Sequence, residues 1–206
     1  NYLIAGGFET FNIELRGHGL SRANGSDYPK KFETYLTYDM PAFADAISQF
    51  TKGKKFFYLG HSLGGSIAYC VGAKIQDKLA GIISIGGPFN MAQGNRLLKA
   101  IAHTGVTLGK LYPFPRLQPD VFYIDTIGIV ASLGLGILDH KWYRVPLQIW
   151  YPGSIEKDIL TERITKGFDR TSFNVVKFFF EWGARGKFIS SDGKIDFEEE
   201  IKNLTA

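Results

Sequence analysis

Residues 60–65, with the sequence GHSLGG, place a serine among glycines in a pattern that could support nucleophilic chemistry. A serine hydroxyl attacks a carbonyl carbon when a neighbouring base removes its proton. The attack also requires an exposed hydroxyl, which a sharp turn between a strand and a helix provides. The pattern G-x-S-x-G is short enough to arise by chance, so its neighbours along the chain decide its meaning. Here an apolar run, Phe56–Leu59, precedes it and small residues follow it, which favours a nucleophile elbow.

This setting predicts a role for each residue of the motif. We expect Ser62 to be the nucleophile and the backbone N–H of Leu63, at a helix N-terminus, to be one of two oxyanion donors. Gly60, Gly64 and Gly65 are expected because the backbone at the serine is strained and a Cβ there would strike the neighbouring strand and helix. The structural alternative is a serine that only caps the helix.

The flanking elements must form a sheet that holds this turn. Alternating apolar residues predict a half-buried strand over 11–15, which leads through a glycine turn into a loop over 16–37. A helix is predicted with Asp39 as its N-cap and with Gly53 closing it. Continuous apolar runs predict two strands buried on both faces, and small residues at helical spacing predict a helix close to the sheet. These strands span 56–59 and 80–86, and the helix spans 63–78. The alternating order predicts a parallel sheet with right-handed crossovers.

Three stretches together, FNIELRGHGLS, DMPAFADAI and YLGHSLGGSIAY, resemble the lipase and esterase branch of the α/β-hydrolase superfamily with a helical cap. The resemblance covers residues 1–87 and is loose beyond them. It implies an α/β fold with a doubly wound, mostly parallel sheet and an inserted helical cap. It also implies acyl-ester hydrolysis through an acyl-enzyme on Ser62, with Gly17, His18 and Gly19 at the active-site rim. Serine at the nucleophile position argues against the related dehalogenases and epoxide hydrolases, which carry Asp there, and against polyester synthases, which carry Cys.

A serine nucleophile needs a histidine base and a carboxylate that orients it. The resemblance implies that both follow the serine in the chain, after later strands. The chain has four histidines, His18, His61, His103 and His140. We expect His61 to pack beneath the site and His103 and His140 to be surface or interhelical residues of the cap. Asp139 is adjacent to His140, but the side chains of adjacent residues rarely point at each other in the geometry by which a carboxylate orients an imidazole.

No carboxylate directly follows the predicted strand 80–86. We therefore expect the triad Asp and His, the second oxyanion donor and several strands to lie outside this chain, which would be truncated at both ends. The alternative is a natural chain without a triad that serves as a non-catalytic binding or scaffold module.

The predicted domains are a core over 1–87, a helical cap over 88–187 and a return segment over 188–206. Helical patterns in the cap lie near 94–103, 121–138, 156–166 and 171–185. The cap is rich in aromatic residues, which favour an apolar acyl group over a small polar substrate. The stretch 121–138 is short for a bilayer span, so we predict a lid helix that makes transient contact with a lipid surface.

Composition excludes several other classes of protein. The chain has 206 residues, a formal charge of +4 and ordinary apolar and charged fractions, as in a globular domain. Its basic residues are scattered, so no nucleic-acid partner is expected. The single cysteine, Cys70, excludes an internal disulfide and a multi-cysteine zinc site. We expect no cofactor and no metal, and a small-molecule ester or lipid as substrate; the compartment stays open.

Overall fold

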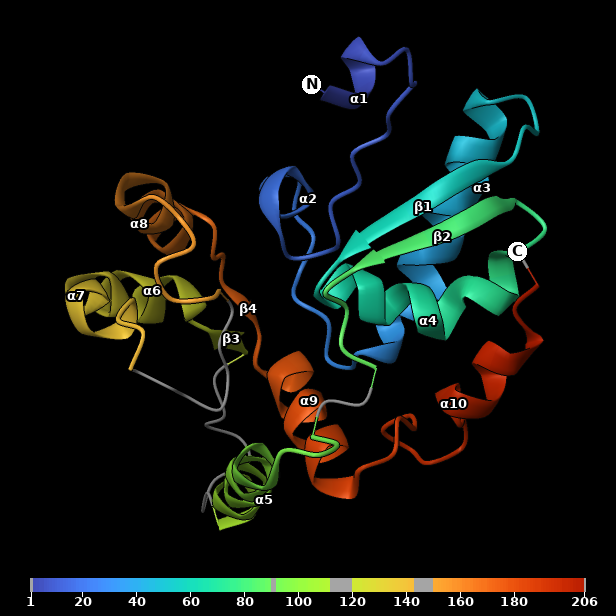
Figure 1. The fold of residues 1–206 in the computed structure, drawn as a ribbon. Helices are drawn as coiled ribbons and strands as arrows, with labels where there is room; N and C mark the ends of the chain where they lie inside the picture. The colour runs from blue at the N-terminus through green and yellow to red at the C-terminus, as the bar shows by residue number, and fades with distance from the viewer. Residues whose placement is uncertain (1, 90–91, 112–119, 143–149, 206) are drawn as a thin grey trace. The chain divides into compact units, whose positions relative to one another are not determined.

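The contacts in the computed structural model divide the chain into two units (Figure 1). The structure describes residues 2–89, 92–111, 120–142 and 150–205. Unit 1 comprises Asn1–Asp27, Phe32–Phe89 and Ile189–Ala206, and unit 2 comprises Tyr28–Lys31 and Asn90–Phe188. The predicted division into core, cap and return segment stays a prediction.

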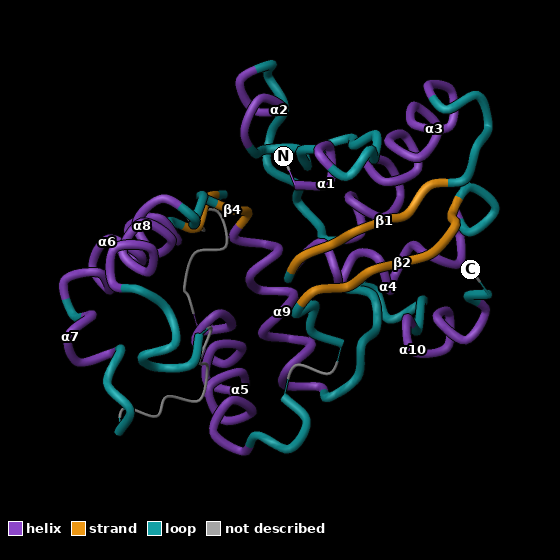
Figure 2. Tube along the Cα trace, turned by 45° about the horizontal axis from the view of Figure 1, so that its top comes forward, coloured by secondary structure: helices purple, strands orange, loops and turns teal. Residues whose placement is uncertain are grey.

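A strand–helix–strand element forms the centre of unit 1. Strand β1 (Phe56–His61) pairs in parallel with β2 (Leu79–Ile85), and helix α4 (Leu63–Ile75) connects them. In Figure 2 the two strands lie side by side, and α4 packs against both of them. The parallel pairing predicted from the sequence is therefore confirmed for these two strands.

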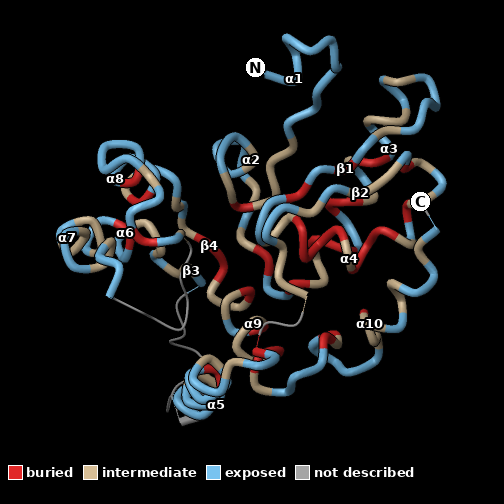
Figure 3. Tube along the Cα trace, in the orientation of Figure 1, coloured by how far each residue is buried: buried red, intermediate tan, exposed pale blue. Residues whose placement is uncertain are grey.

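The two faces of this sheet differ in burial. Tyr58 and Gly60 are buried on the side of α4, where Figure 3 shows most of the buried residues of this element. On the other face Phe57 is 64% exposed and Leu59 is 47% exposed, and their neighbours Ile83 and Ile85 on β2 are also exposed. The prediction of strands buried on both faces is wrong for the described residues, because α4 covers one face only.

Helix α4 lies close to the sheet because it carries glycines where it crosses the strands. A Cβ on Gly72 would lie 2.6 Å from Ile82 Cδ1 and 3.4 Å from Leu204 Cδ1. Leu204 belongs to the C-terminal segment, in which helix α10 (Phe197–Glu200) and a 3₁₀ turn (Ile201–Asn203) pack on α4. The Thr205 N–H donates to Gln76 Oε1 at 2.9 Å, just after α4 ends.

The segment before β1 departs from the sequence prediction. Helix α1 (Tyr2–Ala5) is followed by residues 8–15 without secondary structure, so the predicted strand over 11–15 is wrong. A strand needs a paired neighbour for its N–H and C=O groups, and no described segment forms a ladder with these residues. The predicted loop over 16–37 contains helix α2 (Gly19–Ala23) and the start of a π-helical turn (η1, Tyr35–Asp39).

Asp39 has a different role from the predicted N-cap. The π-helical turn runs directly into α3 (Met40–Phe50), so Asp39 has helical dihedral angles and its side chain caps no N–H. Its buried carboxylate instead accepts a hydrogen bond from Arg16 Nε at 2.8 Å, and it also accepts from the Arg16 backbone N–H at 3.3 Å. The hydrogen bond to Asp39 raises the pKa of the Arg16 guanidinium above its usual value.

Unit 2 is mainly helical. A two-residue antiparallel ribbon joins β3 (Val121–Phe122) and β4 (Thr171–Ser172). Helix α5 packs on α9, and α6 packs on α8. The helices are α5 (Arg96–Leu111), α6 (Ile124–Leu133), α7 (Leu135–Leu138), α8 (Lys157–Lys166) and α9 (Phe173–Arg185). The predicted single helix over 121–138 is wrong, because β3 occupies its start and Gly134 separates α6 from α7. Among the described residues, no helix is both long and apolar enough to span a bilayer.

Two interactions fix the ends of the unit 2 helices. Ser172 caps α9 by accepting from the Val175 N–H, and its hydroxyl donates to the carbonyl oxygen of Pro29 at 2.6 Å. Asp139, which follows α7, accepts from the Gly153 N–H at 2.8 Å and from Trp150 Nε1 at 2.9 Å. These two donors lower the pKa of Asp139, the Gly153 N–H more than the indole.

Candidate active site

Ser62 occupies the sharp turn between β1 and α4 and has a strained backbone. Its φ of 51° and ψ of −112° lie outside the left-handed helical region that non-glycine residues tolerate best. Such a conformation costs on the order of 1–3 kcal/mol and persists only where its surroundings hold it. Here the Ser62 N–H donates to the Ile85 carbonyl oxygen at 2.9 Å, and the Ser62 carbonyl oxygen accepts from the Ser66 N–H at 3.1 Å. The turn is thus held between the end of β2 and the first turn of α4.

Glycines at the turn allow the backbone segments to approach each other. A Cβ on Gly60 would lie 2.5 Å from the Gly64 carbonyl carbon and 2.7 Å from the Gly65 nitrogen. A Cβ on Gly65 would lie 2.8 Å from Gly87 Cα, in the segment after β2. These are backbone contacts that cannot rotate away, so only glycine fits at Gly60 and Gly65. Gly64 differs, because its nearest neighbour would be Tyr58 Oη at 3.9 Å.

The Ser62 side chain is exposed, and within the described residues its hydroxyl forms no hydrogen bond that caps α4. The alternative of a serine that only caps the helix is therefore wrong. The N–H groups of the first helical turn, Leu63 and Gly64 among them, have no acceptor within the helix. They create a positive potential beside the serine, which is the environment that a developing oxyanion requires. The oxyanion role of Leu63 stays a prediction.

Hydrogen bonds from two buried hydroxyls, neither of which is predicted from the sequence, hold the first turn of α4. The Tyr58 hydroxyl donates to the Gly64 carbonyl oxygen at 2.9 Å, and burial raises its pKa, so it remains a protonated donor. The Ser66 hydroxyl donates to the Pro88 carbonyl oxygen at 2.7 Å. Tyr58 alternates with exposed residues along β1, but residues 56–59 are apolar throughout, so the sequence does not distinguish the two faces of the strand. No local sequence pattern predicts the hydrogen bond from Ser66 to Pro88.

The loop with Gly17, His18 and Gly19 is held by its own polar contacts. Gly17 has a φ of +80°, and its N–H donates to Ser26 Oγ at 3.0 Å. Gly19 has a φ of +45° and begins α2, whose first N–H groups donate to the Glu14 carboxylate as their cap. A Cβ on Gly19 would require that carboxylate to move. The place of this loop at the active-site rim stays a prediction.

A family model described as serine aminopeptidase, S33, matches residues 1–125, which is more than half of the chain and includes the whole β1–α4 turn. The chain belongs to the S33 serine aminopeptidase family. This family lies in the α/β-hydrolase superfamily, so the resemblance inferred from the sequence is confirmed at that level. Membership indicates the α/β-hydrolase fold and a hydrolase, without specifying the bond that is cleaved. A search of curated proteins and a search of solved structures each gave no significant match.

The structure shows the surroundings of three of the histidines of this S33 family member. His61 is exposed at the end of β1, so the prediction that it packs beneath the site is wrong. His103 is exposed on α5, and the His140 ring lies against Trp142, with 5.4 Å between ring centroids. Asp139 is engaged by Trp150 and by a backbone N–H rather than by His140. Within the described residues, no group of three or more His, Cys, Asp or Glu could hold a metal ion.

Proposed function

We propose that this S33 family member is a serine hydrolase of carboxylic esters that reacts through an acyl-enzyme on Ser62. The observation that supports this most is the strained backbone of Ser62 at an exposed turn, where Gly60 and Gly65 leave no space for a Cβ. Strain at a solvent-exposed serine has no structural benefit when the side chain caps nothing. It does present the hydroxyl to a substrate above the N-terminus of α4.

In the proposed reaction the Ser62 hydroxyl oxygen attacks the ester carbonyl carbon and its proton passes to a general base. The Leu63 N–H donates to the oxygen that becomes negatively charged in the tetrahedral intermediate. Collapse of the intermediate breaks the bond to the alcohol oxygen, which leaves with the proton and gives the acyl-enzyme. Water then attacks the acyl carbon and releases the acid, restoring the Ser62 hydroxyl.

We also propose that the acyl group is apolar and that unit 2 contributes to a helical cap of a doubly wound, mostly parallel α/β-hydrolase fold. The first part of the proposal rests on the apolar side chains that α6 and α7 present to solvent. Leu133 is 86% exposed, and Ile127, Val130 and Ile137 are also exposed. Exposed apolar clusters of this kind are typical of surfaces that contact a lipid or a partner. The α6–α7 surface would contact the aggregated substrate transiently.

The lipid contact can be tested with phosphatidylcholine vesicles. The double substitution Val130→Ser and Leu133→Ser is expected to weaken sedimentation with the vesicles, and Phe57→Ser, on the exposed sheet face of unit 1, is the matched control. If both variants bind vesicles as the unmodified protein does, or if hydrolysis shows no preference for longer acyl chains and no activation at an interface, the lipid part of the proposal is wrong.

Labelling with a fluorophosphonate probe tests the nucleophile directly. The experiment uses the protein as its gene encodes it, together with the present 206-residue chain. We expect Ser62→Ala to abolish labelling, while Ser154→Ala, which removes another exposed serine, leaves it unchanged. Labelling of the gene-encoded protein only would mean that the base lies outside the present chain.

Two outcomes would change the assignment. A folded gene-encoded protein that is not labelled would support the alternative, a non-catalytic module that holds an apolar ligand. Labelling at Ser62 together with faster cleavage of aminoacyl amides than of matched esters would place the activity with the aminopeptidase that the family description names.

A further inference from the structure

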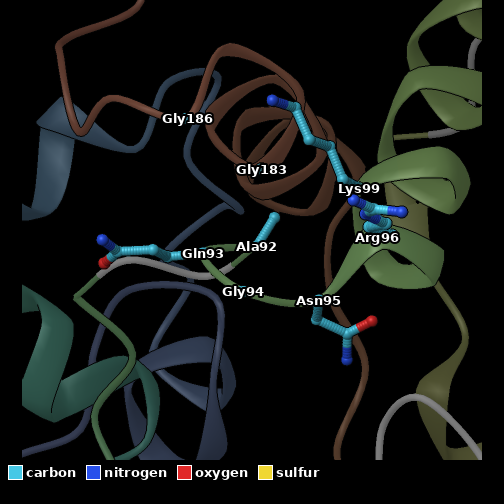
Figure 4. Close-up of a pocket in the computed structure, with 8 residues that line it drawn as sticks. All are labelled: Ala92, Gln93, Gly94, Asn95, Arg96, Lys99, Gly183 and Gly186. Atoms are coloured by element: carbon cyan, nitrogen blue, oxygen red, sulfur yellow. The ribbon is translucent and has the colours of Figure 1, made fainter.

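A cavity of about 430 Å³ lies within unit 2, beside the N-terminal turn of α5 (Figure 4). Arg96 and Lys99 line it from α5, and the turn 93–95 lines it before the helix begins. Gly183 and Gly186, at the C-terminal end of α9, form the opposite wall. Figure 4 shows the Lys99 side chain extending from α5 toward the α9 residues. The volume is within the range of sites for small molecules.

The lining of this cavity is positively charged and contains no carboxylate. The polar residues that line it are Gln93, Asn95, Arg96 and Lys99. In the parts of the chain that the structure describes, neither Arg96 nor Lys99 forms an ion pair, whereas Lys166 and Arg170 of unit 2 do. The two charges are one helical turn apart and thus repel each other.

The position of the cations adds a second unfavourable term. Cations are disfavoured in the first turn of a helix, where the macrodipole is positive, and α5 has no acidic residue there. Asn95 caps the helix by accepting from the Leu98 N–H at 2.9 Å. Residues that break a local rule without a compensating contact are expected at functional sites. An anion in the cavity would compensate both the repulsion and the dipole.

We propose that this cavity binds a phosphate group that carries two negative charges. A dianion neutralises both cations, whereas a carboxylate neutralises one, and the guanidinium and ammonium groups together offer enough donors for its oxygens. Glycines on the opposite wall leave the backbone accessible, since Gly186 has a φ of +68° and no heavy atom lies within 4 Å of where its Cβ would be. The site belongs to unit 2 and does not use Ser62, so it goes beyond the proposed hydrolase activity.

Isothermal titration calorimetry of the full protein with inorganic phosphate, at constant ionic strength, tests this proposal. We expect saturable binding of phosphate, and much weaker binding of acetate. The double substitution Arg96→Gln and Lys99→Gln is expected to weaken phosphate binding about tenfold, the effect of two partly screened charge-assisted contacts. The charge-matched control is Lys54→Gln with Lys55→Gln, two exposed lysines of unit 1, which is expected to bind as the unmodified protein does.

The outcomes separate the proposal from its alternatives. Absence of saturable binding, equal weakening in the two double variants, or acetate binding as tight as phosphate binding would each overturn it. Sedimentation with phosphatidylcholine vesicles, with and without phosphatidic acid, identifies the source of the phosphate. If the site binds a lipid headgroup, the unmodified protein sediments with the acidic vesicles and the Arg96→Gln and Lys99→Gln variant does not. If the site binds a soluble phosphate, the protein binds inorganic phosphate but does not sediment with either type of vesicle. Fluorophosphonate labelling of the Arg96→Gln and Lys99→Gln variant is expected to be unchanged. Failure of the phosphate-binding proposal would therefore leave the proposed hydrolase function intact.

Discussion

Substitution of Gly60 by alanine tests whether close backbone contact builds the turn at Ser62. The new Cβ would lie 2.5 Å from both the carbonyl carbon and the carbonyl oxygen of Gly64 and 2.7 Å from the Gly65 nitrogen. Carbon atoms in contact are normally about 3.5–4.0 Å apart, so α4 would have to move away by about 1 Å. Such a movement would also lengthen the bond from Tyr58 to the first turn and the contact between Gly65 and Gly87.

The expected magnitude follows from these distances. Inserting a methyl group into a packed site typically costs about 1–3 kcal/mol, and the backbone atoms here cannot rotate away, so we expect about 3 kcal/mol of lost stability. In a chain of this size that corresponds to a fall in Tm of about 6–12 °C. Gly64→Ala is the matched control, because its Cβ would meet only Tyr58 Oη at 3.9 Å. We expect Gly64→Ala to change stability by less than about 0.5 kcal/mol, with a small gain from helix propensity.

Thermal unfolding followed by far-ultraviolet circular dichroism is the appropriate assay. Tryptophan fluorescence reports on unit 2 instead, because all three tryptophans, Trp142, Trp150 and Trp182, belong to it. Amide hydrogen exchange in α4 would localise the effect, with faster exchange in Gly60→Ala than in Gly64→Ala. If Gly60→Ala unfolds at the same temperature as the unmodified protein, or if both variants are equally destabilised, the close packing described for the elbow is not what holds it.

Two further predictions concern buried hydroxyls and acid stability. Ser84 Oγ is buried with no hydrogen-bond partner in the described residues, so we expect Ser84→Ala to change the free energy of unfolding by less than about 0.5 kcal/mol. We expect Ser66→Ala to lower the free energy of unfolding by about 1–2 kcal/mol, because it leaves the Pro88 carbonyl oxygen without its donor. Urea unfolding of the two variants compares them directly, and equal losses of stability would contradict these hydrogen-bond assignments. The pKa of Asp139 is lowered in the folded state from 3.8, so its stabilising contribution is present above that pH and is lost as the pH falls through the lower folded value. Trp150 fluorescence in an acid titration should therefore change below pH 3.8, and an identical profile in Asp139→Asn would show that another group is responsible.

The turn at Ser62 could be predicted from sequence because all the signals for it are local. An apolar run, a G-x-S-x-G motif and small residues at helical spacing lie next to one another in residues 56–72, and the structure places β1, the turn and α4 there. The parallel partner β2 follows from the same logic, since a strand after a crossover helix returns beside the first strand.

The errors arise where the outcome depends on a distant partner. Apolar character predicted that Phe57 and Leu59 are buried, but burial requires a covering element, and α4 covers only the opposite face. Asp39 has a good N-cap composition, but its carboxylate is occupied by Arg16, which is 23 residues away in the chain. Alternation over 11–15 shows that these residues could form a strand, and pairing decides whether they do. Side-chain bonds such as that from Ser66 to Pro88 depend on the three-dimensional meeting of two elements.

The interleaved order of the two units has a consequence for folding kinetics. Unit 1 is completed by contacts between distant residues, such as the Thr205 bond to Gln76, which are 129 positions apart. Closing a loop of about 100 disordered residues costs about 4 kcal/mol of chain entropy. When unit 2 is folded, Ala92 and Gly186, near its two ends, line one cavity, so the loop is effectively short. We therefore expect the tryptophan signal of unit 2 to reach its native value in refolding before α10 acquires its protection against hydrogen exchange.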